Sequence, residues 1–231
     1  ILVEEAMMRQ FLISAVILLI INLKVVFSTL PNQRPDYDKR TYHSTAIDNL
    51  IDQLTPYFAS SDIATIFSNC LPNTLDTTVS YATPNPSTVD PSTLDSFVIT
   101  GDIDALWLRD SMNQVIPYIP YATNDTSLQY LLEGLINRQG NSVLIDPFAN
   151  AFNYDATKGK GHQSDIRTPP MTAPVFEGKY EIDSIAAFLK LSYWYYYYVG
   201  DEALIRFANK NWLTAVQTVL NTVQTMQNDN G

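Results

Sequence analysis

Apolar residues recur at helical spacing through much of this chain, and this periodicity limits its fold more than any other feature. The clearest stripe consists of Leu128, Leu131, Leu132, Leu135 and Ile136. Residues three and four positions apart share one face of an α-helix, so the stripe predicts a helix that buries this face. Long polar segments separate the apolar stripes. The pattern therefore predicts a mainly α-helical fold, with packed helices joined by long loops.

A second stripe lies near the end of the sequence and consists of Trp212, Val216, Val219, Leu220 and Val223. It predicts an amphipathic helix that runs into a polar stretch at residues 227–231. An apolar helix face needs a partner element that covers it. Because no later segment supplies one, we expect the chain to be part of a longer protein.

Two further helical regions are indicated. Residues 45–69 have helical spacing that is interrupted by Pro56, and Gly200 is placed to end a buried helix. That helix carries the aromatic run Tyr193–Tyr198, which offers a platform for sugar rings. Consecutive residues face all around a helix, however, so we interpret the run mainly as a core or wall element.

The loops are also marked by composition. Residues 71–96 are rich in Pro, Thr, Ser and Asp, which favour turns. The run Ser96–Thr100 favours a short strand, so we expect short β-strands near residues 77–100. Residues 140–176 are expected to form a long loop.

The first residues resemble a secretory signal. Met7 or Met8 is a plausible start, and Arg9 precedes the apolar run Phe11–Leu23. This length and a small residue at Ser28 predict that residues 1–28 hold an N-terminal extension and a signal peptide, and that the protein is secreted. A membrane anchor that stays uncleaved is the alternative.

We expect a linker at residues 29–44 and the N-terminal portion of a single domain at residues 45–231. The sequon at Asn124 predicts a glycosylation site, which agrees with secretion.

The charge and the rare residue types exclude several classes of function. A net charge of −10 argues against nucleic acid and anionic membranes as partners. A single cysteine allows no disulfide within the chain, and two histidines give no zinc-ligand cluster. No glycine-rich nucleotide loop is present. We therefore expect a neutral ligand, no cofactor and no metal.

One motif, at residues 100–114, concentrates acidic, basic and aromatic residues in a way that a fold alone does not need. It contains Asp102, Asp104, Trp107, Arg109 and Asp110. Carboxylates and guanidinium groups bind sugar hydroxyls, and an indole covers the apolar face of a pyranose ring. The motif thus indicates a sugar site, and the alternative is a helix start with a capping Asp and a local ion pair.

Two later motifs add polar candidates. Asn150 and Asn153 lie among small and aromatic residues in the segment Asp146–Asn153, and their alternative role is in a turn beside core Phe residues. Glu181 and Asp183 precede an apolar helix, where helix capping is the alternative role.

Glycoside hydrolysis commonly uses two carboxyl groups. The candidates for such a pair are Asp102, Asp104, Asp110, Glu181 and Asp183, and the sequence does not decide between them.

Five motifs in order carry a family resemblance. They are Cys70–Thr78, Thr100–Ser111, Arg138–Gln139, Asp146–Asn153 and Lys179–Ser184. Together they resemble glycoside hydrolase family 125, the metal-independent exo-α-1,6-mannosidases. The resemblance implies an (α/α)6 barrel that is incomplete in this chain, and inverting removal of terminal mannose from an oligosaccharide or glycoprotein glycan.

The resemblance also implies roles for residues. Arg109 and Asp110 are expected to clamp hydroxyls of the terminal sugar, with Asp102 and Asp104 supporting them. Glu181 and Asp183 are expected near this pocket. The family's general acid and base are expected beyond residue 231, so the chain alone is expected to be inactive.

Two alternatives remain open at this point. One is another (α/α)6 glycosidase, of glucoamylase or trehalase type. The other is a glycan-binding remnant without catalysis.

Overall fold

The computed structural model describes residues 30–155, 157, 161 and 165–228. The chain divides into Ile1–Pro31 and a compact unit, Asn32–Gly231, and only the second is described below. The expected signal peptide at residues 1–28 lies outside the described residues. Among those residues, no helix combines the length and the apolarity needed to cross a bilayer.

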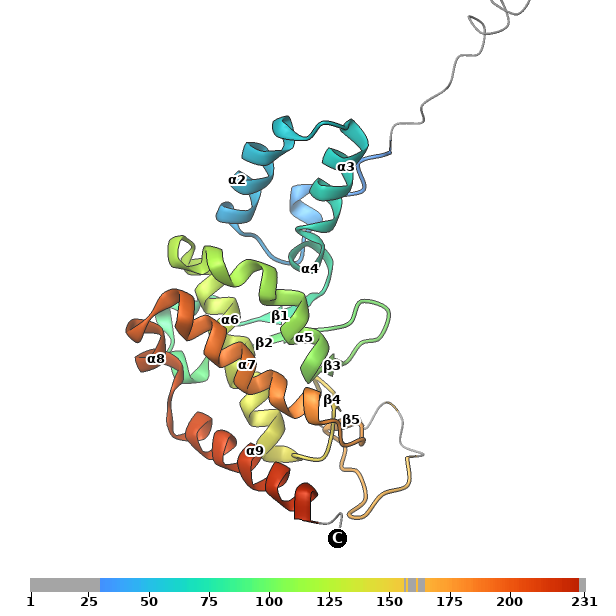
Figure 1. Cartoon of the computed structure of the whole chain (residues 1–231), viewed down its shortest axis with the longest axis vertical. Coiled ribbons are helices and arrows are strands. Elements are labelled where there is room, and N and C mark those ends of the chain that lie inside the picture. The colour runs from blue at the N-terminus through green and yellow to red at the C-terminus, as the bar shows by residue number, and fades with distance from the viewer. Residues whose placement is uncertain (1–29, 156, 158–160, 162–164, 229–231) are drawn as a thin grey trace, which may run out of the picture. The chain divides into compact units, whose positions relative to one another are not determined.

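Helices dominate the compact unit (Figure 1). The α-helices are α2 (Thr45–Leu54), α3 (Ser61–Cys70), α4 (Asn73–Thr77), α5 (Leu108–Val115), α6 (Thr126–Ile145), α7 (Ile182–Val199), α8 (Asp201–Phe207) and α9 (Lys210–Asn228). Short 3₁₀ helices are η1 (Tyr37–Lys39), η2 (Thr55–Tyr57), η3 (Pro86–Thr88), η4 (Pro91–Thr93) and η5 (Ile116–Asn124). The break between α2 and α3 falls at the expected place, because Pro56 lies in η2.

Two small antiparallel sheets accompany the helices. Strands β1 (Val79–Ala82) and β2 (Ser96–Val98) form one sheet, within the expected region of short strands. Strands β3 (Leu106–Trp107), β4 (Ala151–Phe152) and β5 (Val175–Glu177) form the other in the order β3-β4-β5. The second sheet joins segments that are far apart in sequence, and it leads directly into α5 and α7.

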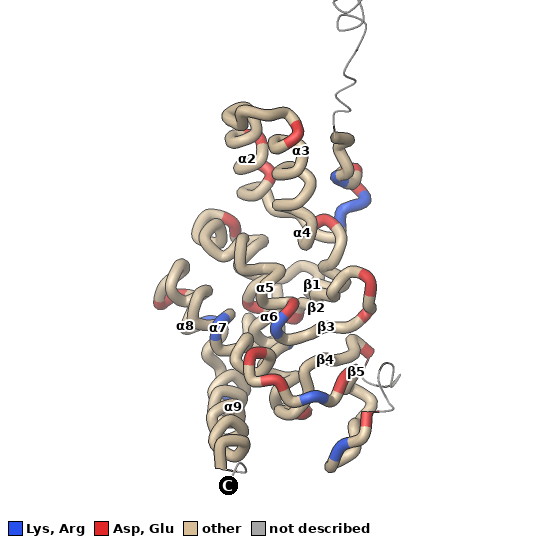
Figure 2. The backbone as a smooth tube through the Cα atoms, turned by 45° about the vertical axis from the view of Figure 1, so that its right-hand side comes forward, with Lys and Arg blue, Asp and Glu red and all other residues tan. Residues whose placement is uncertain are grey.

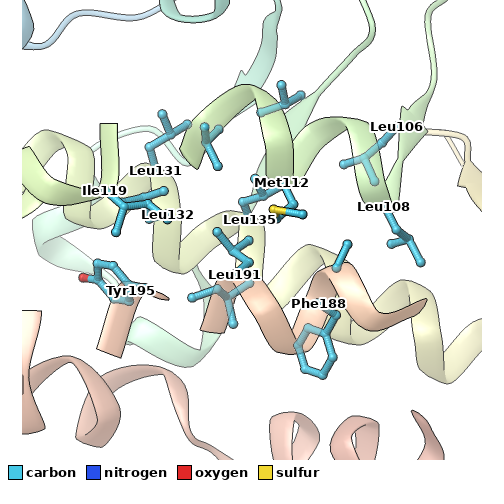
Figure 3. Close-up of a cluster of buried hydrophobic side chains, with 14 of the residues drawn as sticks. Leu106, Leu108, Met112, Ile119, Leu131, Leu132, Leu135, Phe188, Leu191 and Tyr195 are labelled. Atoms are coloured by element: carbon cyan, nitrogen blue, oxygen red, sulfur yellow. The ribbon is translucent and has the colours of Figure 1, made fainter. Parts of the chain in front are cut away.

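The core lies where α6 meets its neighbours. The whole stripe at residues 128–136 that predicted this helix is buried. Helix α7 packs along α5, and α9 packs along α6 (Figure 1). Figure 3 shows Leu132 and Leu135 of α6 beside Leu191 of α7 in this apolar cluster. The helix periodicity of the sequence is therefore confirmed.

The expected loop at residues 140–176 is partly wrong. Helix α6 continues through Gly140 to Ile145, and β4 and β5 lie farther along the same segment. A Cβ atom at position 140 would lie 3.3 Å from Cε2 of Phe188. This glycine therefore allows close packing against α7, and it does not mark the end of the helix.

The partner of α9 comes from earlier segments of the chain. Ala215 and Val219 of α9 are buried against elements that precede them in the chain. Trp212 donates from Nε1 to Oγ of Ser192 on α7 at 3.0 Å. Leu220 alone of the predicted stripe is largely exposed, at 53%. The apolar face of α9 is thus covered mainly by α6 and α7.

The stretch expected as a linker lies against the helices. Arg34 donates from Nε to Oδ2 of Asp76 at 2.7 Å and from Nη2 to Oδ1 of Asp48 at 2.6 Å. Asp76 is buried, so these donors supply the charge that its carboxylate requires.

Capping side chains set several helix ends. Oδ1 of Asp125 accepts from the backbone N–H groups of Ser127 and Leu128, which starts α6. Its Oδ2 accepts from Oγ of Ser44, the residue that caps α2, at 2.6 Å. Helix α7 ends at Gly200 as predicted, with a φ of 88° that favours glycine.

The aromatic run on α7 divides between core and surface. Tyr195 is fully buried, and its hydroxyl donates to Oε1 of Glu133 at 2.7 Å. Tyr193, Tyr196, Tyr197 and Tyr198 are exposed. Cys70, the single cysteine, is exposed at the end of α3.

Candidate active site

Four of the predicted site residues meet where α5 and α7 begin. Figure 2 shows basic and acidic segments of the chain close to α5. Arg109 lies in the first turn of α5 and donates from Nη1 to Oε2 of Glu181 and to Oδ2 of Asp183, both at 3.0 Å. Its Nη2 lies 3.5 Å from Oδ2 of Asp110. We call Arg109, Asp110, Glu181 and Asp183 the Arg109 cluster.

The cluster is partly open to solvent. The side chain of Arg109 is 36% exposed, and that of Asp183 is 57% exposed. Three carboxylates surround one guanidinium group, so the cluster has a formal charge of −2. It can accept hydrogen bonds from hydroxyl groups and still donate through Arg109, which is the chemistry that binding a sugar requires.

Helix α6 holds the first turn of α5 in place. Gln139 is buried and donates from Nε2 to the carbonyl of Leu108 and to Oγ of Ser111, both at 2.9 Å. The backbone N–H of Leu108 donates to the carbonyl of Asn150 at 3.0 Å. The residue before Arg109 is therefore fixed by both α6 and the segment that leads into β4.

The ion pairs shift two pKa values. The hydrogen bond to Asp183 raises the pKa of the Arg109 guanidinium, and the nearby charges of Glu181 and Asp110 act in the same direction. The same hydrogen bond lowers the pKa of the Asp183 carboxyl. Both groups are therefore charged at neutral pH, so the ion pair between them is present there.

One carboxylate oxygen of Asp110 lacks a hydrogen-bond partner among the described residues. In the described part of the chain, its Oδ2 is buried and accepts no hydrogen bond. The contact with Nη2 of Arg109 at 3.5 Å is electrostatic and too long for a strong hydrogen bond.

Trp107 lies beneath the cluster and not on its surface. It belongs to β3, is 9% exposed and packs edge-on against the ring of Phe176. Its Nε1 donates to Oε2 of Glu177 at 3.2 Å. Asn150 is also buried, and its Nδ2 donates to the same oxygen at 2.7 Å.

The other predicted residues lie elsewhere. Asp102 and Asp104 are exposed in the bend between β2 and β3, and neither forms an ion pair within the described residues. Asn153 donates from Nδ2 to the carbonyls of Ala173 and Val175, which closes the connection between β4 and β5. Asn124, the acceptor of the sequon, is exposed at the end of η5.

Sequence reasoning missed Glu177. This residue is 7% exposed and accepts from Trp107, Asn150 and Nζ of Lys179. Its sequence signal is an acid inside the short run Val175–Gly178, directly before the motif that begins at Lys179.

No group of three or more His, Cys, Asp or Glu residues that could hold a metal ion is found among the described residues. The Arg109 cluster also differs from a metal site in its charge pattern, because a guanidinium group occupies its centre. The arrangement fits recognition of a polar, hydroxylated ligand.

The model of the metal-independent α-mannosidases, glycoside hydrolase family 125, matches residues 60–231. The chain belongs to this family. The matched region of this family member includes the whole Arg109 cluster and the three strands beneath it. The helices accordingly form part of an (α/α)6 barrel, as expected from the resemblance.

Two relatives are informative for this family 125 chain. It is 40% identical over 201 residues to the meiotically up-regulated gene 157 protein of Schizosaccharomyces pombe, which covers 84% of this chain and 38% of that protein. A solved Streptococcus pneumoniae structure from a family of metal-independent α-mannosidases, a non-productive complex with α-1,6-mannobiose, matches with a TM-score of 0.66 and 30% identity. That match covers 78% of this chain and 39% of the other. The chain thus spans about two fifths of the length of both relatives.

Proposed function

We propose that this protein removes a non-reducing terminal α-1,6-linked mannose from an oligosaccharide or glycoprotein glycan. The reaction is hydrolysis with inversion and needs neither a metal ion nor a cofactor. Family membership supports glycosidase chemistry, and the similar Streptococcus pneumoniae structure holds α-1,6-mannobiose. The observation that carries the proposal for this chain is the Arg109 cluster, an open set of charged donors and acceptors at the starts of two helices.

In this proposal Arg109 and Asp110 clamp hydroxyl groups of the terminal mannose. One carboxylate oxygen of Asp110 accepts no hydrogen bond within the described residues, so its capacity to accept a bond is unused there. Hydrogen bonds to Glu181 and Asp183 hold the guanidinium group of Arg109 in one orientation. Such fixed donors favour a bound sugar because they need little reorganisation when it arrives.

The general acid and base are not assigned to residues of this sequence. Inverting glycosidases hold these two carboxyl groups roughly 6.5–9.5 Å apart, on opposite faces of the sugar ring. All acidic members of the Arg109 cluster touch Arg109, which makes them poor candidates for a protonated acid. We propose that the acid and base come from the part of the domain that the relatives have and this chain does not span.

The test uses the protein encoded by the complete reading frame, with α-1,6-mannobiose as substrate. We expect release of mannose, β-anomer first when followed by proton NMR, and no change on addition of EDTA. Arg109→Ala and Asp110→Ala should each lower kcat/KM by on the order of 10²-fold, as loss of a preorganised polar group does.

Lys210→Ala removes a cation from an exposed position at the start of α9 and serves as the control, with activity unchanged. Near-normal kcat/KM in both cluster variants would remove Arg109 and Asp110 from the site. Equal cleavage of α-1,2- and α-1,3-linked mannobiose would overturn the linkage assignment. Mannose binding without release would favour a glycan-binding protein.

A further inference from the structure

The buried carboxylate of Glu177 accepts hydrogen bonds from three side chains among the residues that the structure describes. Its Oε2 accepts from Nδ2 of Asn150 at 2.7 Å and from Nε1 of Trp107 at 3.2 Å, and its Oε1 accepts from Nζ of Lys179 at 2.6 Å. Burial of an ionised carboxylate is costly unless hydrogen bonds and a counter-charge compensate it. Here both kinds of compensation are present, so the carboxylate is held in one orientation.

Two of the donors come from segments that are distant from Glu177 in sequence, and Lys179 lies on its own segment. Trp107 belongs to β3, Asn150 directly precedes β4, and Lys179 follows β5. These strands contain only two or three residues each, and sheets of such short strands gain little stability from their ladder alone. The carboxylate of Glu177 therefore links all three segments through side chains.

Two of the linked segments, β3 and β5, lead into the Arg109 cluster. Trp107 is the N-cap residue of α5, two positions before Arg109. Glu181 is the N-cap residue of α7, four positions after Glu177. The hydrogen bonds from Arg109 span these two helix starts, and a displacement of about 1 Å would take them beyond hydrogen-bond range.

We propose that Glu177 is a positioning residue for the Arg109 cluster. Its carboxylate fixes the distance between the first turns of α5 and α7 through Trp107 and Asn150, and it does not contact the substrate. The catalytic part of this inference rests on the proposed function, whereas its structural part does not.

The test compares Glu177→Gln with the parent protein. Glutamine keeps the size of the side chain, but either orientation of its amide sets the NH₂ group against one of the donors. Trp107→Phe is the second variant, because it removes only the indole N–H donor to Oε2 and keeps an aromatic ring. Glu202→Gln is the control, since it makes the same change at an exposed position on α8.

The first readout is NMR and needs no activity. The chain has three tryptophans, so the indole N–H signal of Trp107 is identified by its loss in Trp107→Phe. In the parent protein we expect separate Nη signals for Arg109, because its ion pairs slow rotation of the guanidinium group. In Glu177→Gln and Trp107→Phe these signals should merge, while the indole signals of Trp194 and Trp212 stay in place and show an intact core.

The second readout is kinetic and uses the complete reading frame. Glu177→Gln should lower kcat/KM for α-1,6-mannobiose by on the order of 10- to 100-fold, the size expected for a misplaced binding group. The loss should appear mainly in KM. Glu202→Gln should behave as the parent protein.

Unchanged Arg109 signals in both variants would overturn the proposal, since Glu177 would then hold only the sheet. Unchanged kcat/KM together with merged Arg109 signals would overturn its catalytic part. If the parent protein cleaves no mannoside, the proposed function fails, and the NMR comparison still decides whether Glu177 positions Arg109.

Discussion

At the scale of single residues, the candidate site depends on how one guanidinium group is shared. Nη1 of Arg109 donates to two carboxylates, and Nη2 faces a third. Lysine carries one ammonium point charge and lacks the planar fork that makes this arrangement possible. We therefore expect that lysine at position 109 cannot replace arginine in the candidate site, although it carries the same charge.

The pKa of the Asp183 carboxyl provides a test of its hydrogen bond with Arg109. Its pKa is lowered by the hydrogen bond from Arg109, so the ion pair stabilises the folded protein at pH values above the unfolded-state pKa of Asp. This contribution is lost as the pH falls through the lower pKa of the folded state. We expect NMR titration to give a midpoint for Asp183 below about 3.9, the ordinary value for Asp.

In Arg109→Met the midpoint should move up toward that ordinary value, because the donor and its charge are gone. Hydrogen bonds from Ser92 lower the pKa of the Asp90 carboxyl, and Asp90 provides the control because removing Arg109 should leave its pKa unchanged. An Asp183 midpoint that is the same with and without Arg109 would contradict the hydrogen bond.

At the scale of elements, close approach between α6 and β2 depends on a glycine. A Cβ atom at Gly134 would lie 2.8 Å from the carbonyl carbon of Asp95 and 2.9 Å from the backbone nitrogen of Ser96. Both are backbone atoms, which cannot move aside as a flexible side chain can.

Gly134→Ala should therefore destabilise the fold. Alanine is the better helix former by about 1 kcal/mol, but overpacking against the strand typically costs about 1–3 kcal/mol. We expect a lower midpoint in urea unfolding. Gly140→Ala is the matched comparison on the same helix, since its nearest contact would be a side-chain ring at 3.3 Å. An equal loss in both variants would show that contact with β2 is not the cause.

Prediction from sequence succeeded best at this scale, and the reason is periodicity. The stripe at 128–136 and the stripe at 212–223 each repeat over several helical turns, and both lie on helices in the structure. Strands β3 and β4 have two residues each, which is too short for any alternation to show. The helix start at Asp125 and the stop at Gly200 follow capping rules, whereas Gly140 has a packing role that composition does not reveal.

The sequence indicated the residues of the candidate site better than it indicated how they are arranged in space. Arg109 lies 72 residues from Glu181, and nothing in the local sequence says which acids meet it. Trp107 was expected to face a sugar, yet its indole is buried and donates to Glu177. Only the three-dimensional structure joins these segments, because the sheet that does so has no signal of its own.

At the scale of the whole molecule, a buried charge joins three helices. Glu133 of α6 is fully buried, accepts from Tyr195 of α7 and pairs with Arg206 of α8 through both of its oxygens. Burial raises the pKa of the Tyr195 hydroxyl, so this group remains a neutral donor over the range in which the protein is studied.

Glu133→Ala should destabilise the molecule by about 3–5 kcal/mol, because it leaves Arg206 partly buried without its partner. The measurement is urea unfolding followed by circular dichroism. Glu202→Ala removes an exposed acid from α8 and should cost far less. Similar losses in the two variants would mean that the buried pair adds nothing to stability.

The hydrogen bonds of Asp125 affect local unfolding of the molecule. One of its oxygens starts α6, and the other binds Ser44 at the start of α2, 81 residues away. Loss of this one carboxylate would remove a hydrogen-bond acceptor from both helix starts at once, so the first turns of α2 and α6 are coupled through it. The start of α2 is in this way fastened to the start of α6 through one shared carboxylate.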